Sequence, residues 1–188
     1  MTARRIGDPL TYNVAGLLAE PVGSTRDYVV AGVTLDLGED LHQADPIEGR
    51  IHLARTNRGL LVRGDLTTSL DEECSRCLRD VEVPLTVHIE EEALPSLDLQ
   101  TGLPLDTTTE PDVLRLNEHH ELDLEDVVRE AIQLGEPIAP LCEPNCPGLC
   151  PICGERLTHG PHDHPDDDID PRLEALRGFQ VDEGSETG

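Results

Sequence analysis

Residues 60–94 read LLVRGDLTTSLDEECSRCLRDVEVPLTVHIEEEAL. The runs 60–70 and 81–94 are predicted to be strands, and the segment Cys74-Ser-Arg-Cys77 lies between them. A C-x-x-C step therefore sits at the bend that joins two antiparallel strands. The stretch predicts a β-hairpin that presents a pair of thiols at its tip.

The neighbouring segments extend this hairpin into a larger sheet. Residues 47–55 alternate in character and then meet the turn-forming segment 56–59. Residues 27–37 are rich in β-branched side chains and predict another strand, and 113–116 predict a short one. Residues 95–112, between the predicted strands 81–94 and 113–116, contain several Pro, Thr, Asp and Gly and show no periodic pattern of apolar residues. This composition indicates a mobile connection.

A helix is predicted after Asp123, which can cap its first turn. Gly135 and Pro137 end it. Its apolar positions have the spacing of one buried face and are Leu124, Val127, Val128, Ala131 and Ile132. A second, short helix is predicted over residues 170–176, where an Asp precedes a Pro.

Composition limits the class of protein. The chain has 188 residues with no Trp, one Phe and two Tyr, so its core must be aliphatic. A formal charge of -25, from 39 acidic and 14 basic residues, argues against a protein that binds nucleic acid over much of its surface. The start of the chain lacks the apolar stretch of an export signal, and no run has the roughly 20 apolar residues of a membrane helix. We therefore expect a cytoplasmic protein, in which cysteines indicate metal or redox chemistry.

Six cysteines fall into two short, polar segments: Cys74, Cys77, Cys142, Cys146, Cys150 and Cys153. A C-x-x-C step lets a tight turn direct two thiolates at one ion, and two such turns supply the tetrahedron that zinc prefers. Buried, unreactive cysteines would not cluster in this way. A redox pair needs its C-x-x-C at the start of a helix, whereas Cys74 follows a predicted strand. Zinc is the favoured interpretation.

Two histidines downstream, His162 and His164, can complete a site begun by Cys150 and Cys153; the alternative is a polar loop that happens to contain histidine. Eight candidate ligands suffice for two zinc ions. Our preferred division joins Cys74 and Cys77 to Cys142 and Cys146, and Cys150 and Cys153 to the two histidines. A ribbon arrangement would instead join the pair 74 and 77 to the pair 150 and 153.

The expected zinc is structural because thiolates lower the Lewis acidity of the metal and no open position or partnered base is evident. The acidic runs 90–92 and 166–168 are interpreted as solvated faces. No nucleophile elbow, phosphate loop or dinucleotide fingerprint is present, so we expect no enzymatic activity. Arg76 and Arg79 flank the first cysteine pair and are candidates for a local RNA contact. Further arginines lie on or near the first hairpin, at positions 50, 55, 58 and 63. For all of them the alternative is ion pairing with nearby carboxylates, which are Asp65, Asp71, Glu72, Glu73 and Asp80.

These features predict an α+β fold in which an antiparallel β-meander packs against one main helix, followed by a C-terminal zinc-knuckle segment. The predicted organisation is an N-terminal segment 1–26, one domain 27–179 that includes the zinc-knuckle region 138–165, and a disordered tail 180–188.

Four landmarks in this order resemble the YceD family: DEECSRCL at 71–78 between two strands, a helix that ends at a Pro, PLCEPNCPGLCPICG at 140–154, and DPRL at 170–173. The resemblance covers most of the chain. It implies support of the accumulation of large-subunit (23S) ribosomal RNA, without a defined catalytic activity. Many members carry Cys-x-Cys near the place of His162 and His164, which favours these histidines as ligands; other members lack the second cysteine cluster.

With this resemblance, we expect a ribosome-biogenesis factor whose partners are large-subunit ribosomal proteins or assembly particles, with at most a local contact to RNA. Two other classes remain open from the residues. One is a module that hands zinc to another protein. The other is an enzyme, either a thiol oxidoreductase or a zinc hydrolase, which would require an exposed low-pKa thiolate or an open metal position.

Overall fold

The computed structural model describes residues 9–99, 101–105, 110, 113–160, 164 and 172. The chain forms two compact units, Met1–Cys146 and Pro147–Gly188. The second unit contains η1 (Leu157–His159), a single 3₁₀ turn. The predicted domain 27–179 spans both units, and its boundaries stay a prediction.

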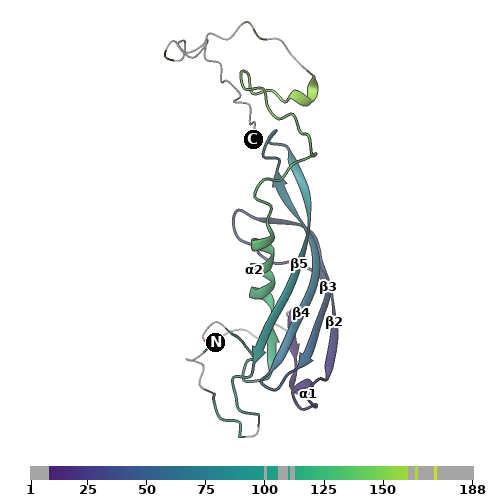
Figure 1. The fold of residues 1–188 in the computed structure, drawn as a ribbon, viewed down its shortest axis with the longest axis vertical. Coiled ribbons are helices and arrows are strands. Elements are labelled where there is room, and N and C mark those ends of the chain that lie inside the picture. Colours follow the sequence, from purple (N-terminus) through teal and green to yellow (C-terminus); the bar gives the residue numbers. More distant parts are fainter. Residues whose placement is uncertain are drawn as a thin grey trace, which may run out of the picture. The chain divides into compact units, whose positions relative to one another are not determined.

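The first unit is built on one five-stranded sheet (Figure 1). Four strands pair antiparallel in chain order, and a fifth, much shorter strand runs parallel to the fourth. The strands are β2 (Thr25–Val33), β3 (His42–Arg55), β4 (Leu60–Glu73), β5 (Asp80–Leu94) and β6 (Leu114–Arg115). The predicted antiparallel meander is confirmed, and β6 makes the complete sheet mixed.

The longest unbroken pairing joins β4 to β5. It runs from Leu60 opposite Ala93 to Glu73 opposite Asp80 without a register shift. The hairpin tip is therefore residues 74–79, the cysteine segment predicted for the bend. β3 pairs with β4 only as far as His42 opposite Asp71, so β4 and β5 continue past β3 toward this tip.

The first predicted strand is displaced. It was expected over residues 27–37, but β2 begins at Thr25 and ends at Val33. A bulge between Val30 and Val33 shifts its register against β3, and Gly32 adopts a φ of +70° there. A left-handed residue interrupts the pleat, and this ends the regular pairing.

A second, two-stranded sheet was not predicted. β1 (Thr11–Asn13) pairs antiparallel with β7 (Glu121–Asp123), and α1 (Ala15–Leu18) follows β1. Strands of three residues are too short to show alternation. Residues 9–18 nevertheless bury Leu10, Val14 and Leu17 completely. The predicted boundary at residue 27 thus leaves outside the domain a segment that contributes to its core.

The predicted helix is α2 (Glu125–Gly135). Its N-cap residue is Leu124, one position later than predicted, and the Asp123 carboxylate accepts a hydrogen bond from the Glu125 N–H at 3.0 Å. α2 lies beside β5 (Figure 1). In the described part of the chain, no helix is long and apolar enough to span a membrane.

The core of the first unit is aliphatic, as the composition predicted. Its side chains come from both sheets and from both helices, and Ile47, Ile51, Leu53, Leu66 and Leu70 are among those fully buried. The two tyrosines of the chain, Tyr12 and Tyr28, pack against each other at its edge, with ring centroids 4.5 Å apart and ring planes tilted by 45°. The tyrosine pair links β1 to β2 and so ties the small sheet to the large one.

Several predictions concern residues beyond those described. These are the tail 180–188, His162, the acidic run 166–168 and the helix at 170–176, of which only residue 172 is described. The predicted strand 113–116 is present as β6, and the connection 95–112 is described only in part.

The α2 packing predicts that Val128→Asp unfolds the first unit. The Val128 side chain is fully buried, so an aspartate there would bury an unpaired charge at a cost of at least about 3 kcal/mol. Leu134 on the same helix is 88% exposed, and Leu134→Asp should change stability by less than about 0.5 kcal/mol. Thermal melting followed by circular dichroism measures both. Equal stability of the two variants would contradict the packing of α2.

Candidate metal centres

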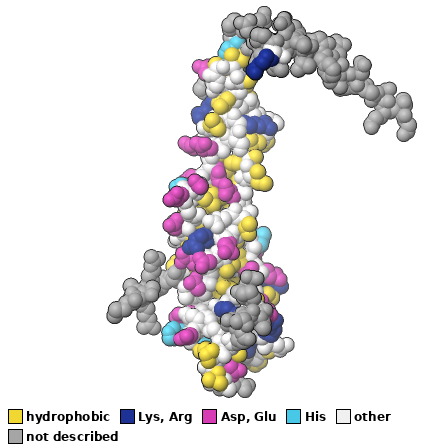
Figure 2. Space-filling view, turned by 90° about the vertical axis from the view of Figure 1, so that its left-hand side faces the viewer, with side chains coloured by type: hydrophobic (Ala, Val, Ile, Leu, Met, Phe, Trp, Pro, Cys, Tyr) yellow, Lys and Arg dark blue, Asp and Glu magenta, His cyan; other side chains and the backbone are white. Residues whose placement is uncertain are grey.

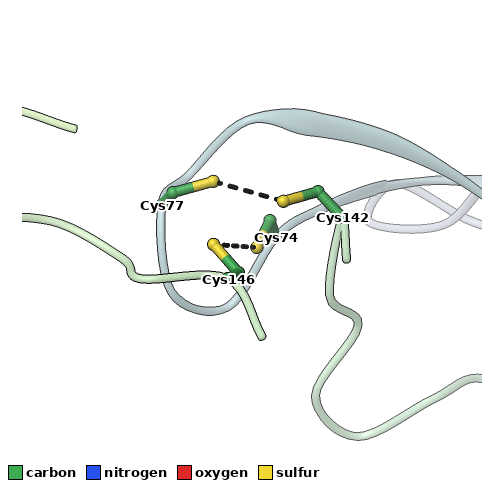
Figure 3. Close-up of side chains that lie close together, drawn as sticks. All are labelled: Cys74, Cys77, Cys142 and Cys146. Atoms are coloured by element: carbon green, nitrogen blue, oxygen red, sulfur yellow. Dashed lines mark hydrogen bonds between the residues drawn. The ribbon is translucent and has the colours of Figure 1, made fainter. Parts of the chain in front are cut away.

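Four cysteines of the first unit converge at the tip of the β4–β5 hairpin. Cys74 and Cys77 come from the tip, Cys142 and Cys146 come from the segment after α2, and all four sulfurs lie within 4.8 Å of one another (Figure 3). The sulfur–sulfur distance is 3.8 Å between Cys74 and Cys146 and 3.7 Å between Cys77 and Cys142. A tetrahedral zinc ion with Zn–S bonds of about 2.3 Å requires sulfurs about 3.8 Å apart. This group could therefore hold a metal ion with little rearrangement.

Local hydrogen bonds shape the hairpin tip. The Cys74 N–H donates to the Arg79 carbonyl at 2.8 Å, and the Leu78 N–H donates to the Cys74 carbonyl at 2.9 Å. Leu78 closes this turn with a φ of +52°. The second segment is attached through Ser75, whose N–H donates to the Pro140 carbonyl at 2.9 Å. These hydrogen bonds hold both pairs of cysteines at the tip.

The second group lies in the other unit and consists of Cys150, Cys153 and His164, with ligand atoms within 4.8 Å of one another. The Cys150 sulfur lies 3.2 Å from Nε2 of His164. Cys150 is buried and Cys153 is exposed. His162, the other predicted histidine ligand, lies outside the described residues. Three of the four predicted ligands are thus together.

The two C-x-x-C turns have the same backbone geometry. In the second turn the Cys150 N–H donates to the Glu155 carbonyl at 2.7 Å, and the Gly154 N–H donates to the Cys150 carbonyl at 2.9 Å. Both bonds join the same relative positions as in the first turn. The residue after the second cysteine is left-handed in each case, with a φ of +74° at Gly154. The fold thus builds one kind of cysteine turn twice, once with glycine and once with leucine at the strained position.

The grouping follows the preferred division of the ligands. Cys74 and Cys77 meet Cys142 and Cys146, and Cys150 and Cys153 meet His164. The ribbon arrangement, with 74 and 77 joined to 150 and 153, is not the grouping that the described residues form. The chain order explains this, because α2 returns the segment after residue 135 to the tip of the hairpin that precedes it.

The polar surroundings favour a thiolate at Cys74. Backbone N–H groups of Cys142 and Arg76 donate to its sulfur and lower its pKa to about 6, although burial opposes this shift. A thiolate, not a thiol, is the metal ligand. These hydrogen bonds therefore favour the form of Cys74 that binds a metal.

The two arginines proposed for RNA contact turn toward the cysteines. Nη1 of Arg76 donates to the Cys146 carbonyl at 3.0 Å. The Arg79 guanidinium donates to the Cys142 side chain, and this hydrogen bond raises the pKa of Arg79 further. A cation beside thiolate ligands offsets their negative charge. The signal in the sequence was the position of both residues next to the first cysteine pair, which we interpreted as either a local RNA contact or ion pairing with nearby carboxylates.

Other arginines of the sheet form ion pairs, as the alternative to RNA contact predicted, but with different carboxylates. Arg63 pairs with Glu90 at 3.0 Å, and Arg58 pairs with Glu92 and Glu110. The partners that sequence proximity suggested were Asp65, Asp71, Glu72, Glu73 and Asp80. Cross-strand register decides the pairing here, since Arg63 lies directly opposite Glu90.

The fold and these turns define a sheet-based α+β protein with two cysteine-rich groups of metal-binding geometry. The chain belongs to the YceD family, described as large ribosomal RNA subunit accumulation proteins, whose model matches residues 62–180. Uncharacterized proteins of Mycobacterium tuberculosis and Mycobacterium bovis are 30% identical over 92% of this chain and 82% of their own length. An uncharacterized protein of Mycobacterium leprae is 32% identical over 76% of this chain and 64% of its own length. No solved structure matches the chain.

Leu78→Gly should stabilise the metal-loaded first unit. A left-handed conformation costs a leucine about 1 kcal/mol that glycine does not lose. Because the Leu78 side chain is 55% exposed, its removal sacrifices little packing. Chemical denaturation should show a gain of roughly 1 kcal/mol. The reciprocal control is Gly154→Ala, which should weaken metal retention in the second turn; a loss of stability in Leu78→Gly would contradict the shared geometry.

Proposed function

We propose that this protein is a non-catalytic ribosome-biogenesis factor that supports accumulation of large-subunit (23S) ribosomal RNA through protein partners. The observation that carries the proposal is membership of the YceD family over residues 62–180, since that family is described by this role. The two metal-binding groups then serve the shape of the protein. The expected place of action is the cytoplasm, where ribosomes assemble.

The metal that we propose is zinc in a structural role. Support comes from the donor set, because four thiolates at tetrahedral spacing suit zinc and leave no position for a water or substrate. The burial of Cys74, Cys77 and Cys146 supports the same role. A hydrolase or an oxidoreductase is disfavoured by these features, since the first needs an open position and the second an accessible thiolate.

A zinc-handling module is the second candidate. One observation favours it: Cys153 of the second group is exposed, whereas three cysteines of the first group are buried. An exposed thiolate can be attacked by an accepting ligand, which would permit exchange at this site only. This function would be favoured if a competing chelator removed zinc from the second group much faster than from the first.

Partners are proposed to be large-subunit ribosomal proteins or assembly particles rather than naked RNA. A formal charge of -25 opposes the approach of phosphate and favours basic proteins. Arg76 and Arg79, the candidates for RNA contact, are engaged with the cysteine segment, which further supports protein partners.

The zinc proposal predicts about two zinc ions per chain in protein purified without chelator. Cys142→Ser and Cys150→Ser should each lower the content to about one ion, because each removes a ligand from a different group. Glu143→Gln, which changes a neighbouring charge but no thiol, is the control and should retain both ions. Elemental analysis measures the content. Protein without zinc, or loss of both ions from either cysteine variant, would contradict two separate sites.

The ribosomal proposal predicts that deletion of the protein lowers large-subunit RNA relative to small-subunit RNA in the cell. Sucrose-gradient sedimentation should show fewer large subunits, and the wild-type protein should sediment with their precursors. The purified protein should bind large-subunit RNA only weakly at physiological salt. Unchanged subunit ratios after deletion would remove the ribosomal assignment, and tight RNA binding would overturn the partner-mediated mechanism.

A further inference from the structure

A groove of about 420 Å³ lies between β5 and α2 in the first unit. Four consecutive β5 residues, 88–91, line it, together with Val113 and Leu114 at the start of β6. Successive residues of a strand point to opposite faces, so a groove that contacts four in a row follows the edge of the strand rather than one face.

This edge of β5 is open in the described part of the chain. β6 pairs only with Ala93 and Leu94, so β5 has no strand beside it from Asp80 to Glu92 on the side away from β4. Pro84 lies in this stretch and cannot donate a backbone hydrogen bond, as is typical of an edge strand. An unpaired edge offers a row of backbone donors and acceptors to an added strand.

The floor of the groove is apolar and comes largely from α2. The sequence assigned five apolar positions to a single buried face, but only Leu124, Val128 and Ile132 are fully buried. Val127 and Ala131 remain partly exposed and line the groove with Leu134, which is 88% exposed. These three residues have the spacing of a second apolar stripe on the helix. Val127 and Ala131 pack against the core on one side, and their remaining surface lines the groove with Leu134.

The rim of the groove is acidic. Glu90 and Glu91 border it from β5, and Glu130 borders it from α2. Glu91 stands at the position where the alternation of Val87 and Ile89 would place another apolar residue. Among the described residues, Glu91 and Glu130 form no ion pair, while Glu90 meets Arg63. In Figure 2, which faces the side where α2 lies, acidic side chains outnumber arginines and lie beside exposed apolar ones.

We propose that this groove binds an extended segment of a partner protein whose every second side chain faces α2, and that these α2-facing side chains include both apolar residues and arginine or lysine. The segment pairs with the open edge of β5, its apolar side chains cover Val127, Ala131 and Leu134, and its cations meet Glu91 and Glu130. This inference rests on the proposed function, because it describes the kind of segment by which a protein partner would be recognised. A second copy of the chain would bring glutamates against glutamates, and RNA would bring phosphates against them, so both fit this rim poorly.

The test uses the full-length, metal-loaded protein and a short fluorescent peptide in which every second residue is valine or arginine in turn, with serine between them. We expect saturable binding by fluorescence anisotropy, weakened at least about tenfold in Leu134→Asp and in Glu91→Arg with Glu130→Arg. The matched control is Glu39→Arg with Glu118→Arg, which changes the net charge equally at exposed sites outside the groove and should retain most of the affinity.

Two altered peptides separate the parts of the interaction. Alternate backbone amides of the bound peptide face β5, and the others face away from it. N-methylation of the set that faces β5 should abolish binding, because it removes the donors that pair with β5, whereas N-methylation of the other set should not. Serine in place of valine should weaken binding about tenfold or more, because it removes the apolar contacts. Equal weakening by the control variant, equal binding of the serine peptide, displacement of the peptide by single-stranded RNA, or a dimer lost in Leu134→Asp would each overturn the proposal.

Complementation distinguishes this proposal from the ribosomal one. If deletion depletes large-subunit RNA and the Glu91→Arg, Glu130→Arg variant restores it as well as wild type, the groove assignment fails and the ribosomal function stands. If deletion leaves the ratio of large-subunit to small-subunit RNA unchanged, the ribosomal function fails. The peptide-binding experiment then still tests whether the groove binds a segment with apolar and cationic side chains. We expect depletion on deletion, restoration by the control variant and none by the groove variant.

Discussion

The first unit depends on the unbroken antiparallel pairing of β4 with β5. Fourteen pairs in one register fix which residues face the core, since a slip of one position would turn every side chain to the other face. The same register brings Glu73 opposite Asp80 and leaves six residues for the tip. Both the aliphatic core and the cysteine turn therefore follow from one set of backbone hydrogen bonds. α2 is placed by the same constraint, because it packs on β5 and returns the chain toward the tip.

Much of this arrangement could be predicted from local patterns. The hairpin, the cysteines at its bend, α2 and the preferred grouping of the ligands all depend on features that lie close together in the sequence: strand runs, a C-x-x-C step and helical spacing. β1 and β7 could not be found this way, since each is three residues long and gains its stability from the other, more than a hundred residues away. The bulge that ends β2 early is likewise a property of its pairing with β3 and not of its own composition.

At the candidate site, the sequence identified the thiols but not what supports them. Gly154 follows Cys153 and readily adopts a positive φ, whereas the equivalent Leu78 carries no signal of its left-handed conformation because leucine rarely adopts a positive φ. The arginines beside the first cysteine pair suggested either an RNA contact or ion pairs with carboxylates, and their contacts in the structure are with Cys142 and Cys146. Arg76 and Arg79 thus lie beside the cysteines, whereas Glu91 on the edge of β5 and Glu130 on α2 form no ion pair among the described residues.

The position of the four-cysteine group has a consequence for the unfolded chain. Cys77 and Cys142 are separated by 65 residues, and β5, β6, β7 and α2 all lie between them. A metal ion held by these thiolates closes that length into a loop, which restricts the unfolded ensemble much as a covalent cross-link does, by about 4 kcal/mol for a loop of this size. Such an ion would therefore act on elements far from its ligands, and its withdrawal would lower the cooperativity of the whole unit rather than loosen the tip alone.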